Sequence, residues 1–202
     1  MIEKISYFKE ILKDEKNDIV DIINKNIIFG VPYIFKDDEE KYYNLKRKLS
    51  SFFKVNHRDI FMVGSAKLGF SISPKKLWNQ LDWDSKKESD IDMVVISNKA
   101  FDKYWKSILE YKEKTIGTSV KDEKEKEFLD YFFNGWLRPD KFPQKYKGSD
   151  EWFDFFRSIS YKEEFGGRKI AVAIYREDYF FMKYHRNNLV SIRNNLRNER
   201  RI

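Results

Sequence analysis

The chain reads IFMVGSAKLGFS over residues 60–71 and SDIDMVVIS over residues 89–97, and these two stretches decide the predicted fold. Each contains a short run that is almost wholly apolar, Ile60–Val63 in the first and Ile91–Ile96 in the second. Runs of this length and composition are typical of buried strands. A third run of this kind, Lys169–Tyr175, lies far along the chain. The sequence therefore predicts a small sheet.

Helical patterns of apolar residues surround the predicted strands. Residues 2–26 are expected to form one helix, and a second helix is expected to begin at Asp37 or Asp38. Strands embedded among helices indicate an α+β fold, with a small mixed sheet flanked by helices. The remaining helices are expected shortly after Pro74, from Asn98 or Asp102, around residues 128–136, from Ser149 or Asp150, and over residues 177–198.

The length of 202 residues predicts a single domain. Hydrophobic residues make up 41% of the chain and aromatic residues 17%, which is enough for a sizeable core. We divide the domain into N-terminal helices (1–56), a core (57–175) and a basic C-terminal helix (176–202).

The charge balance and the cysteine count narrow the classes of function. Forty Lys and Arg against 33 Asp and Glu give a net charge of +7, which favours anionic partners. The absence of cysteine excludes disulfides, thiol catalysis and cysteine-ligated zinc. No signal peptide or membrane-spanning segment is predicted, so we expect a cytoplasmic protein without a membrane partner.

The turn after the first predicted strand has the composition of a phosphate site. Gly64 has no side chain, so the backbone can approach a ligand closely, and Ser65 adds a hydroxyl and a backbone amide. If a helical turn begins there, its unpaired amides point at an anion. Lys67 is a candidate to contact a triphosphate, and the alternative is an ordinary exposed lysine. Gly69 closes the loop, and a phosphate is the expected occupant.

The second predicted strand carries two carboxylates. Side chains alternate along a strand, so Asp90 and Asp92 point to one face while Ile91, Met93 and Val95 point to the other. Two neighbouring carboxylates repel each other unless a cation lies between them. Mg²⁺ prefers oxygen ligands and is typically held by one or two carboxylates together with substrate phosphates.

These features together resemble the polymerase-beta-type nucleotidyltransferase superfamily. The resemblance covers roughly residues 58–97, and the third strand only by its order in the chain. It implies that Gly64 and Ser65 hold a nucleotide phosphate. It also implies that Asp90 and Asp92 bind two Mg²⁺ ions, which activate the attacking hydroxyl and stabilise the leaving pyrophosphate. The implied activity transfers a nucleotidyl group from an NTP, in the first instance ATP, to a hydroxyl of RNA, DNA or protein.

The third predicted strand departs from the pattern of that superfamily, which usually places a third carboxylate there. One face of this strand carries Ile170, Val172 and Ile174, and the other carries alanines and a tyrosine. Neither face has an acid. Either the strand alignment is wrong or a substitute carboxylate reaches the site, for which the candidates are Glu177, Asp178, Glu164 and Asp150.

The missing acid also supports a second interpretation. The chain would then be a catalytically degenerate member that binds a nucleotide, nucleic acid or protein partner without turnover, as in bacterial toxin–antitoxin or phage-defence systems. That analogy rests on the fold alone. Oligomerisation remains open in both interpretations.

Basic residues are concentrated at the end of the chain and permit a third interpretation. A helix carrying Arg193, Arg197, Arg200 and Arg201 could grip a nucleic-acid backbone, although a solvated helix face explains the same residues. His185 falls on the apolar stripe of this helix and is expected at the edge of the core. Two further groups are expected to have surface or structural roles: Asp82 and Asp84 as surface acids rather than ligands, and the aromatic residues from Trp152 to Phe156 in the core.

Overall fold

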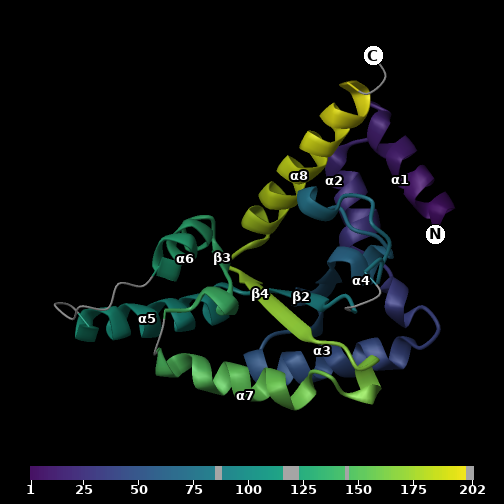
Figure 1. Cartoon of the computed structure of the whole chain (residues 1–202). Helices are drawn as coiled ribbons and strands as arrows, with labels where there is room; N and C mark the ends of the chain where they lie inside the picture. The colour runs from purple at the N-terminus through teal and green to yellow at the C-terminus, as the bar shows by residue number, and fades with distance from the viewer. Residues whose placement is uncertain (85–87, 116–122, 144–145, 199–202) are drawn as a thin grey trace.

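The computed structural model describes residues 1–84, 88–115, 123–143 and 146–198 (Figure 1). Within these residues a four-stranded mixed sheet is flanked by helices, which confirms the predicted α+β class. The strand order is β1-β2-β4-β3, with β2 and β4 parallel and the other two pairs antiparallel. The strands are β1 (Ile60–Val63), β2 (Ile91–Ile96), β3 (Trp136–Leu137) and β4 (Ile170–Tyr175).

The register of the sheet aligns the two predicted stretches. Val63, the last residue of β1, lies beside Asp92 of β2, and Asp92 lies beside Ala171 of β4. One residue further along β2, Met93 lies beside Val172. The alternation predicted for β2 is confirmed, because Ile91, Met93 and Val95 belong to one core and Val94 belongs to another.

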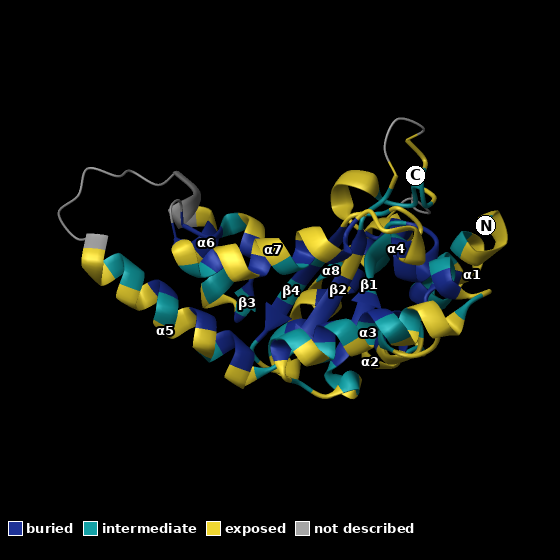
Figure 2. Cartoon of the chain, turned by 90° about the horizontal axis from the view of Figure 1, so that it is seen from below, coloured by how far each residue is buried: buried dark blue, intermediate teal, exposed yellow. Residues whose placement is uncertain are grey.

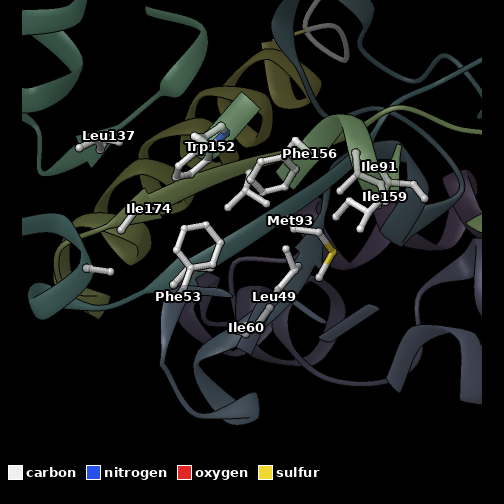
Figure 3. Close-up of a cluster of buried hydrophobic side chains, with 14 of the residues drawn as sticks. Leu49, Phe53, Ile60, Ile91, Met93, Leu137, Trp152, Phe156, Ile159 and Ile174 are labelled. Carbon is white, nitrogen blue, oxygen red and sulfur yellow. The ribbon is translucent and has the colours of Figure 1, made fainter. Parts of the chain in front are cut away.

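The first core fills one face of the sheet, which we call the closed face. Met93 of β2 and Ile174 of β4 are at most 1% exposed there. Figure 3 shows aromatic and aliphatic side chains from the covering helices packed around these strand residues. The helices are α3 (Glu39–Phe53), α5 (Asn98–Thr115), α6 (Glu123–Phe133) and α7 (Asp150–Ile159), and Figure 2 shows their buried and exposed sides.

The opposite face is covered only in part, and we call it the open face. Phe61, Val94 and Tyr175 point to this side and pack against the first and last helices of the chain. In Figure 1 these helices lie side by side, away from α3 and α7. They are α1 (Ile2–Lys13), α2 (Ile19–Ile22), the π-helix η1 (Ile23–Ile28) and α8 (Asp178–Asn198).

The prediction of one helix over residues 2–26 is wrong, because α1 ends at Lys13 and a new helix begins at Ile19. Short polar side chains cause the break by bonding to the backbone. Asp14 accepts a hydrogen bond from the amide of Lys16, and Asp18 caps α2 by accepting one from Val20. Such bonds offer the backbone an alternative to helical pairing.

The prediction of a helix reaching Trp136 is also wrong. Helix α6 ends at Phe133, and Gly135 turns the chain with a φ of 64°. Trp136 then pairs with Tyr175 as part of the short edge strand β3. The positive φ explains the glycine, since other residues adopt this conformation at a cost.

Smaller elements complete the chain. Asp38 is confirmed as the cap of α3, because it accepts a hydrogen bond of 3.3 Å from the amide of Lys41. The hydroxyl of Ser149 donates to the carbonyl of Tyr146 and does not cap α7. Helix α4 (Gly64–Leu68) follows β1 directly. The short 3₁₀ helices are Tyr33–Phe35, His57–Asp59, Pro74–Lys76, Pro139–Lys141, Lys147–Ser149 and Glu163–Phe165.

The helices of the described part of the chain include none that combines the length and the apolar character needed to cross a membrane.

Candidate functional site

A cavity of about 480 Å³ opens on the open face, where β1 ends and β2 begins. Gly64, Ser65, Asp90 and Asp92 all line it, so two stretches separated by a long loop meet at one place. The antiparallel pairing of β1 with β2 explains the meeting, because it puts Val63 beside Asp92. The structure therefore brings together four of the five residues that the sequence suggested. We call this space the main cavity.

Gly64 lies directly against the carboxylate of Asp92. A Cβ atom added at Gly64 would lie 3.1 Å from Asp92 Oδ2, and the backbone there has a φ of 72°. Both facts favour glycine, because a side chain would crowd the carboxylate and the backbone is left-handed. The glycine-serine turn and the aspartate thus form one contact surface.

The environment of Asp92 disfavours an unpaired negative charge. Its side chain is exposed to the cavity, but protein surrounds it on the remaining sides. Burial raises the pKa of Asp92 to about 6, the charge of Asp90 raises it further, and the cations of Arg138 and Lys169 oppose the change. A carboxyl pair of this kind is stabilised in its charged form by a cation.

Asp90 lies beside a lysine at the start of β4. Lys169 Nζ is 3.7 Å from Asp90 Oδ2, and about half of the lysine side chain is exposed. An exposed pair at this distance is weak, so Asp90 remains available to a stronger cation.

An ion pair fixes the segment that leads into Asp90. Arg168 donates to both carboxylate oxygens of Asp82, at 2.8 and 2.7 Å, and to the carbonyl of Ser89 at 3.0 Å. The amide of Ser89 in turn donates to Asp82 at 2.7 Å. These bonds hold the pKa of the Asp82 carboxyl below its usual value. Asp82 does not line the main cavity, in keeping with its prediction as an acid that is no ligand, but its carboxylate also orients the residues before Asp90. Asp84 is exposed and does line the main cavity.

Lys67 does not line the main cavity. Its side chain is 5% exposed, and its ammonium donates to the carbonyls of Phe29 and Gly30, both at 2.5 Å. Burial lowers the pKa of Lys67 to about 8, and the nearby Lys46 lowers it further. The two carbonyls lie at the end of the π-helix η1, so Lys67 fastens that segment to α4. We correct the interpretation of Lys67 as a phosphate contact on this ground.

Four other polar side chains line the wall beyond Ser65, and no sequence motif singles them out. They come from the loop that follows α4, in which the amide of Ser73 donates to the hydroxyl of Ser71 at 3.1 Å. Lys76 has no ion-pair partner among the described residues, so its charge is free to meet an anion. The four residues are Ser71, Ser73, Lys76 and Gln80.

The strand β4 contributes no acidic side chain to the main cavity. Ala171 and Ala173 both line it, with Ala171 paired to Asp92. The register therefore places alanine beside Asp92, and no acid on β4 faces the pair Asp90 and Asp92.

None of the four proposed substitute acids lines the main cavity. Glu164 pairs with Lys48 at 3.0 Å on the other side of the sheet, and Glu177 pairs with Arg176 at 3.5 Å. Asp150 and Asp178 lie in the first turns of α7 and α8. These suggestions are corrected, because all four side chains lie at positions that the cavity does not reach.

A carboxylate that the sequence did not suggest does line the main cavity. Asp140 follows the edge strand β3, and its charge contributes to the raised pKa of Asp92. Both of its oxygens accept hydrogen bonds from Arg138, at 3.1 and 2.9 Å. Since β3 was predicted as helix, no sequence signal placed this residue near Asp92.

Helix α8 forms the far wall of the main cavity through Tyr184, His185 and Asn188. His185 is 6% exposed, which confirms the expectation of a core-edge histidine, and burial lowers its pKa to about 4. Its Nδ1 is buried without a hydrogen-bond partner in the described structure. The imidazole is therefore neutral at pH 7.

Two arginines near the C-terminal end of α8 have structural partners. Arg193 donates to the carbonyls of Leu12 and Asn17, at 2.7 and 2.8 Å, and Arg197 pairs with Glu15. Arg200 and Arg201 lie outside the described residues. Arg193 and Arg197 are thus committed to holding α8 against the N-terminal helices.

The donor set of the main cavity fits a magnesium ion that is shared with a substrate. Among the described residues, no cluster of three or more acidic or histidine side chains could bind a metal ion by itself. Two carboxylates on one strand, facing a cavity large enough for a nucleotide, instead suit an ion that takes its other ligands from phosphates and water.

Comparison of the chain with protein families, with curated proteins and with solved structures gives no match in any of the three. The functional interpretation therefore depends on the geometry of the main cavity.

Proposed function

We propose that this chain is a metal-dependent nucleotidyltransferase of the polymerase-beta type. It transfers a nucleotidyl group from an NTP, in the first instance ATP, to a hydroxyl acceptor. The observation that carries the proposal is the contact of the Gly64-Ser65 turn with Asp92 inside one cavity that Asp90 also lines. A cytoplasmic location belongs to the same proposal.

Each wall of the main cavity has a role in the proposed reaction. Ser65 and the turn at Gly64 hold phosphate oxygens, and Lys76 neutralises part of the triphosphate charge. Asp90 and Asp92 would hold the magnesium, which supplies charge stabilisation at the transferred phosphate when it is bound. The pair Asp82–Arg168 keeps Asp90 in position through Ser89.

The proton of the acceptor hydroxyl needs a destination. Besides Asp90 and Asp92, the carboxylates of Asp84, Glu88 and Asp140 line the same cavity. We take Asp140 as the candidate base, because its charge acts on Asp92. Its two hydrogen bonds from Arg138 compete with that role, since an oxygen that accepts from guanidinium is a weaker base.

This competition favours one alternative function. With alanine at the positions on β4 and Asp140 tied to Arg138, the cavity also suits a module that binds nucleotide without turnover. A role in a bacterial toxin–antitoxin or phage-defence system would fit such a module, by analogy of fold alone.

A transfer assay with labelled NTPs, run beside calorimetry with Mg²⁺ and ATP, tests both functions. We expect Asp90→Asn/Asp92→Asn to lower transfer by roughly a thousand-fold, as for loss of a central electrostatic stabiliser. Thermal melting of the same variant verifies that it is folded. Unchanged transfer would refute the assignment of the site. Magnesium-dependent binding with no transfer to any acceptor would establish the binding module instead.

A further inference from the structure

A second cavity of about 410 Å³ adjoins the main cavity, and we call it the side cavity. Four residues line both spaces, so one wall separates them: Trp136, Tyr175, Tyr184 and Asn188. We propose that the side cavity binds a second nucleotide, and that this nucleotide is the acceptor of the transfer. The acceptor role rests on the proposed function, whereas nucleotide binding in the side cavity does not.

Aromatic rings in the side cavity are arranged to receive a flat ring. The centroid of Trp136 lies 4.9 Å from that of Tyr131 at an angle of 71°, and 4.9 Å from that of Tyr184 at 60°. None of the three rings is fully buried, and Tyr184 is 43% exposed. Tyr175 stacks on Trp136 at an angle of 16°, and the guanidinium of Arg138 lies over the rings of both Tyr131 and Trp136. The exposed ring of Tyr184 is therefore the one that offers a face for stacking, with the edges of the other rings beside it. Nucleobases stack on such rings without regard to sequence.

Amide side chains supply the polar groups that a nucleobase edge requires. Asn134 and Asn188 each donate through Nδ2 to a backbone carbonyl, at 2.8 and 3.0 Å, which fixes the orientation of both amides. Their Oδ1 atoms have no hydrogen-bond donor within the described protein. Asn187 is exposed, also without a described partner, and offers a donor and an acceptor. An asparagine can bond both edge atoms of an adenine.

A lysine at the side cavity provides for a phosphate. Lys183 is exposed, and its ammonium lies 5.7 Å from the ring centroid of Tyr179. No carboxylate pairs with it in the described structure. The rings, amides and free ammonium together match the base face, base edge and phosphate of a nucleotide. No single protein side chain carries all three of these groups.

The main cavity does not need the side cavity to hold the NTP. At about 480 Å³ it falls within the usual range for a complete ligand site, and it contains the carboxylates, the glycine turn and Lys76. Because the two cavities share Trp136 and Tyr184, the proposal places the hydroxyl of a nucleotide in the side cavity at the boundary with the main cavity. In the transfer, this hydroxyl oxygen bonds to the α-phosphorus of the NTP. The bond from that phosphorus to the bridging oxygen breaks and pyrophosphate leaves with the electron pair. The hydroxyl proton passes to Asp140, the candidate base named above, and from there to solvent.

Binding of AMP to the full chain in EDTA, measured by calorimetry, tests the side cavity without any metal. We expect Lys183→Ala/Asn187→Ala to weaken AMP binding by roughly 10- to 150-fold, the range for loss of a hydrogen bond to a charged group. The matched control is Arg186→Ala/Asn194→Ala, which removes the same two kinds of group from exposed positions of α8 that line neither cavity. This control and Asp90→Asn/Asp92→Asn should both bind AMP normally.

A second measurement counts the nucleotides bound with Mg²⁺ and a non-hydrolysable ATP analogue present. We expect one analogue and one AMP for each chain. A single nucleotide, with the two competing, would overturn the inference, because the side cavity would then hold the base of the NTP itself. Absence of AMP binding, or transfer to a protein acceptor alone, would also overturn it.

Short RNA and DNA oligonucleotides separate the two sources of the acceptor. Oligonucleotide binding that Lys183→Ala/Asn187→Ala weakens indicates the end of a strand, and binding of AMP alone indicates a free nucleotide; both support the side cavity. If AMP binds but no magnesium-dependent NTP binding exists, the proposed function fails while the second nucleotide site stands. If NTP binds and AMP does not, the second nucleotide site fails while the proposed function stands.

Discussion

The two faces of the sheet differ sharply, although the same strands build both. On the closed face, large side chains such as Met93 and Val172 fill the space beneath α3, α5 and α7. On the open face, their neighbours Asp92, Ala171 and Ala173 line a cavity. Because side chains alternate along a strand, a residue that packs in the core is followed directly by one that lines the cavity.

The comparison gives the alanines of β4 a physical meaning. A residue as large as Val172 at position 171 or 173 would reduce the space beside Asp92. The alanines therefore keep the main cavity open, and they do so on the strand where the resembling superfamily carries an acid. Mutations that affect one face and leave the other unchanged test this separation.

The largest stability effect is expected on the closed face. Met93→Ala removes a side chain that is 1% exposed, so we expect the free energy of unfolding to fall by about 2–5 kcal/mol. Nucleotide binding per folded molecule should be unchanged, because the side chain points away from Asp92. Denaturant unfolding and calorimetry measure the two quantities. A loss of binding in the folded variant would show that the faces are coupled.

The burial of His185 on the open face makes the stability of the fold depend on pH in the acid range. Its pKa is about 4 in the folded chain, against 6.5 for a free histidine, so the unfolded chain binds the proton more readily. Stability is therefore complete above pH 6.5 and is lost as the pH falls toward 4, by about 3 kcal/mol from this residue.

The pKa of Asp92 is raised, so this residue stabilises the fold more as the pH falls over the same range. The effect of His185 is therefore the difference in unfolding free energy between the wild type and a variant that lacks the histidine. The free energy of unfolding of His185→Leu, compared with the wild type from pH 7 to pH 4, isolates it. Parallel pH curves for the two proteins would contradict the prediction.

Gly64→Ala should affect the site more than the fold. A left-handed φ costs a residue with a Cβ about 1–2 kcal/mol, and the new methyl group would also press on Asp92 Oδ2. We expect this loss of stability and at least a tenfold weaker binding of Mg²⁺–ATP.

Gly30→Ala is the matched control, since Gly30 has a φ of 77° and no atom within 4 Å of an added Cβ. It should lose similar stability and bind ATP normally. Equal binding by both variants would show that the contact with Asp92 does not matter.

The smallest effect is expected at the loop wall of the main cavity. Lys76→Ala removes an uncompensated charge, and we expect about tenfold weaker ATP binding, or about 1.4 kcal/mol, with little change in stability. Lys75→Ala removes the same charge from the neighbouring residue, which does not line the cavity, and should bind ATP normally. Isothermal calorimetry at fixed salt compares them. Equal weakening would indicate a general charge effect.

The sequence was sufficient for the strands β1, β2 and β4, because each is an apolar run too short for a helix. It also placed Asp90 and Asp92 on one face, since alternation follows from strand geometry alone. The edge strand β3 was missed because two residues carry no periodicity, and Asp140 was missed with it.

Lys67 shows the limit of pattern reasoning at the site itself. A lysine two residues after a glycine-serine turn suggests a phosphate contact, but its direction depends on which segment packs against α4. That segment is the π-helix η1, which the sequence presented as the end of an ordinary helix. The lysine that does line the cavity, Lys76, ends the short 3₁₀ helix Pro74–Lys76. Pro74 indicates that helix, but no local signal shows that the helix lies against the cavity.

The bonds from Arg193 to the carbonyls of Leu12 and Asn17 have a consequence for synthesis on the ribosome. Helix α1 leaves the ribosome early, but its partner α8 is made only after nearly all the preceding residues have followed. Since chains emerge at roughly 5–20 residues per second, the N-terminal helices wait on the order of ten seconds for that partner. The closed face can assemble before then, whereas the wall that carries His185 and Tyr184 closes last.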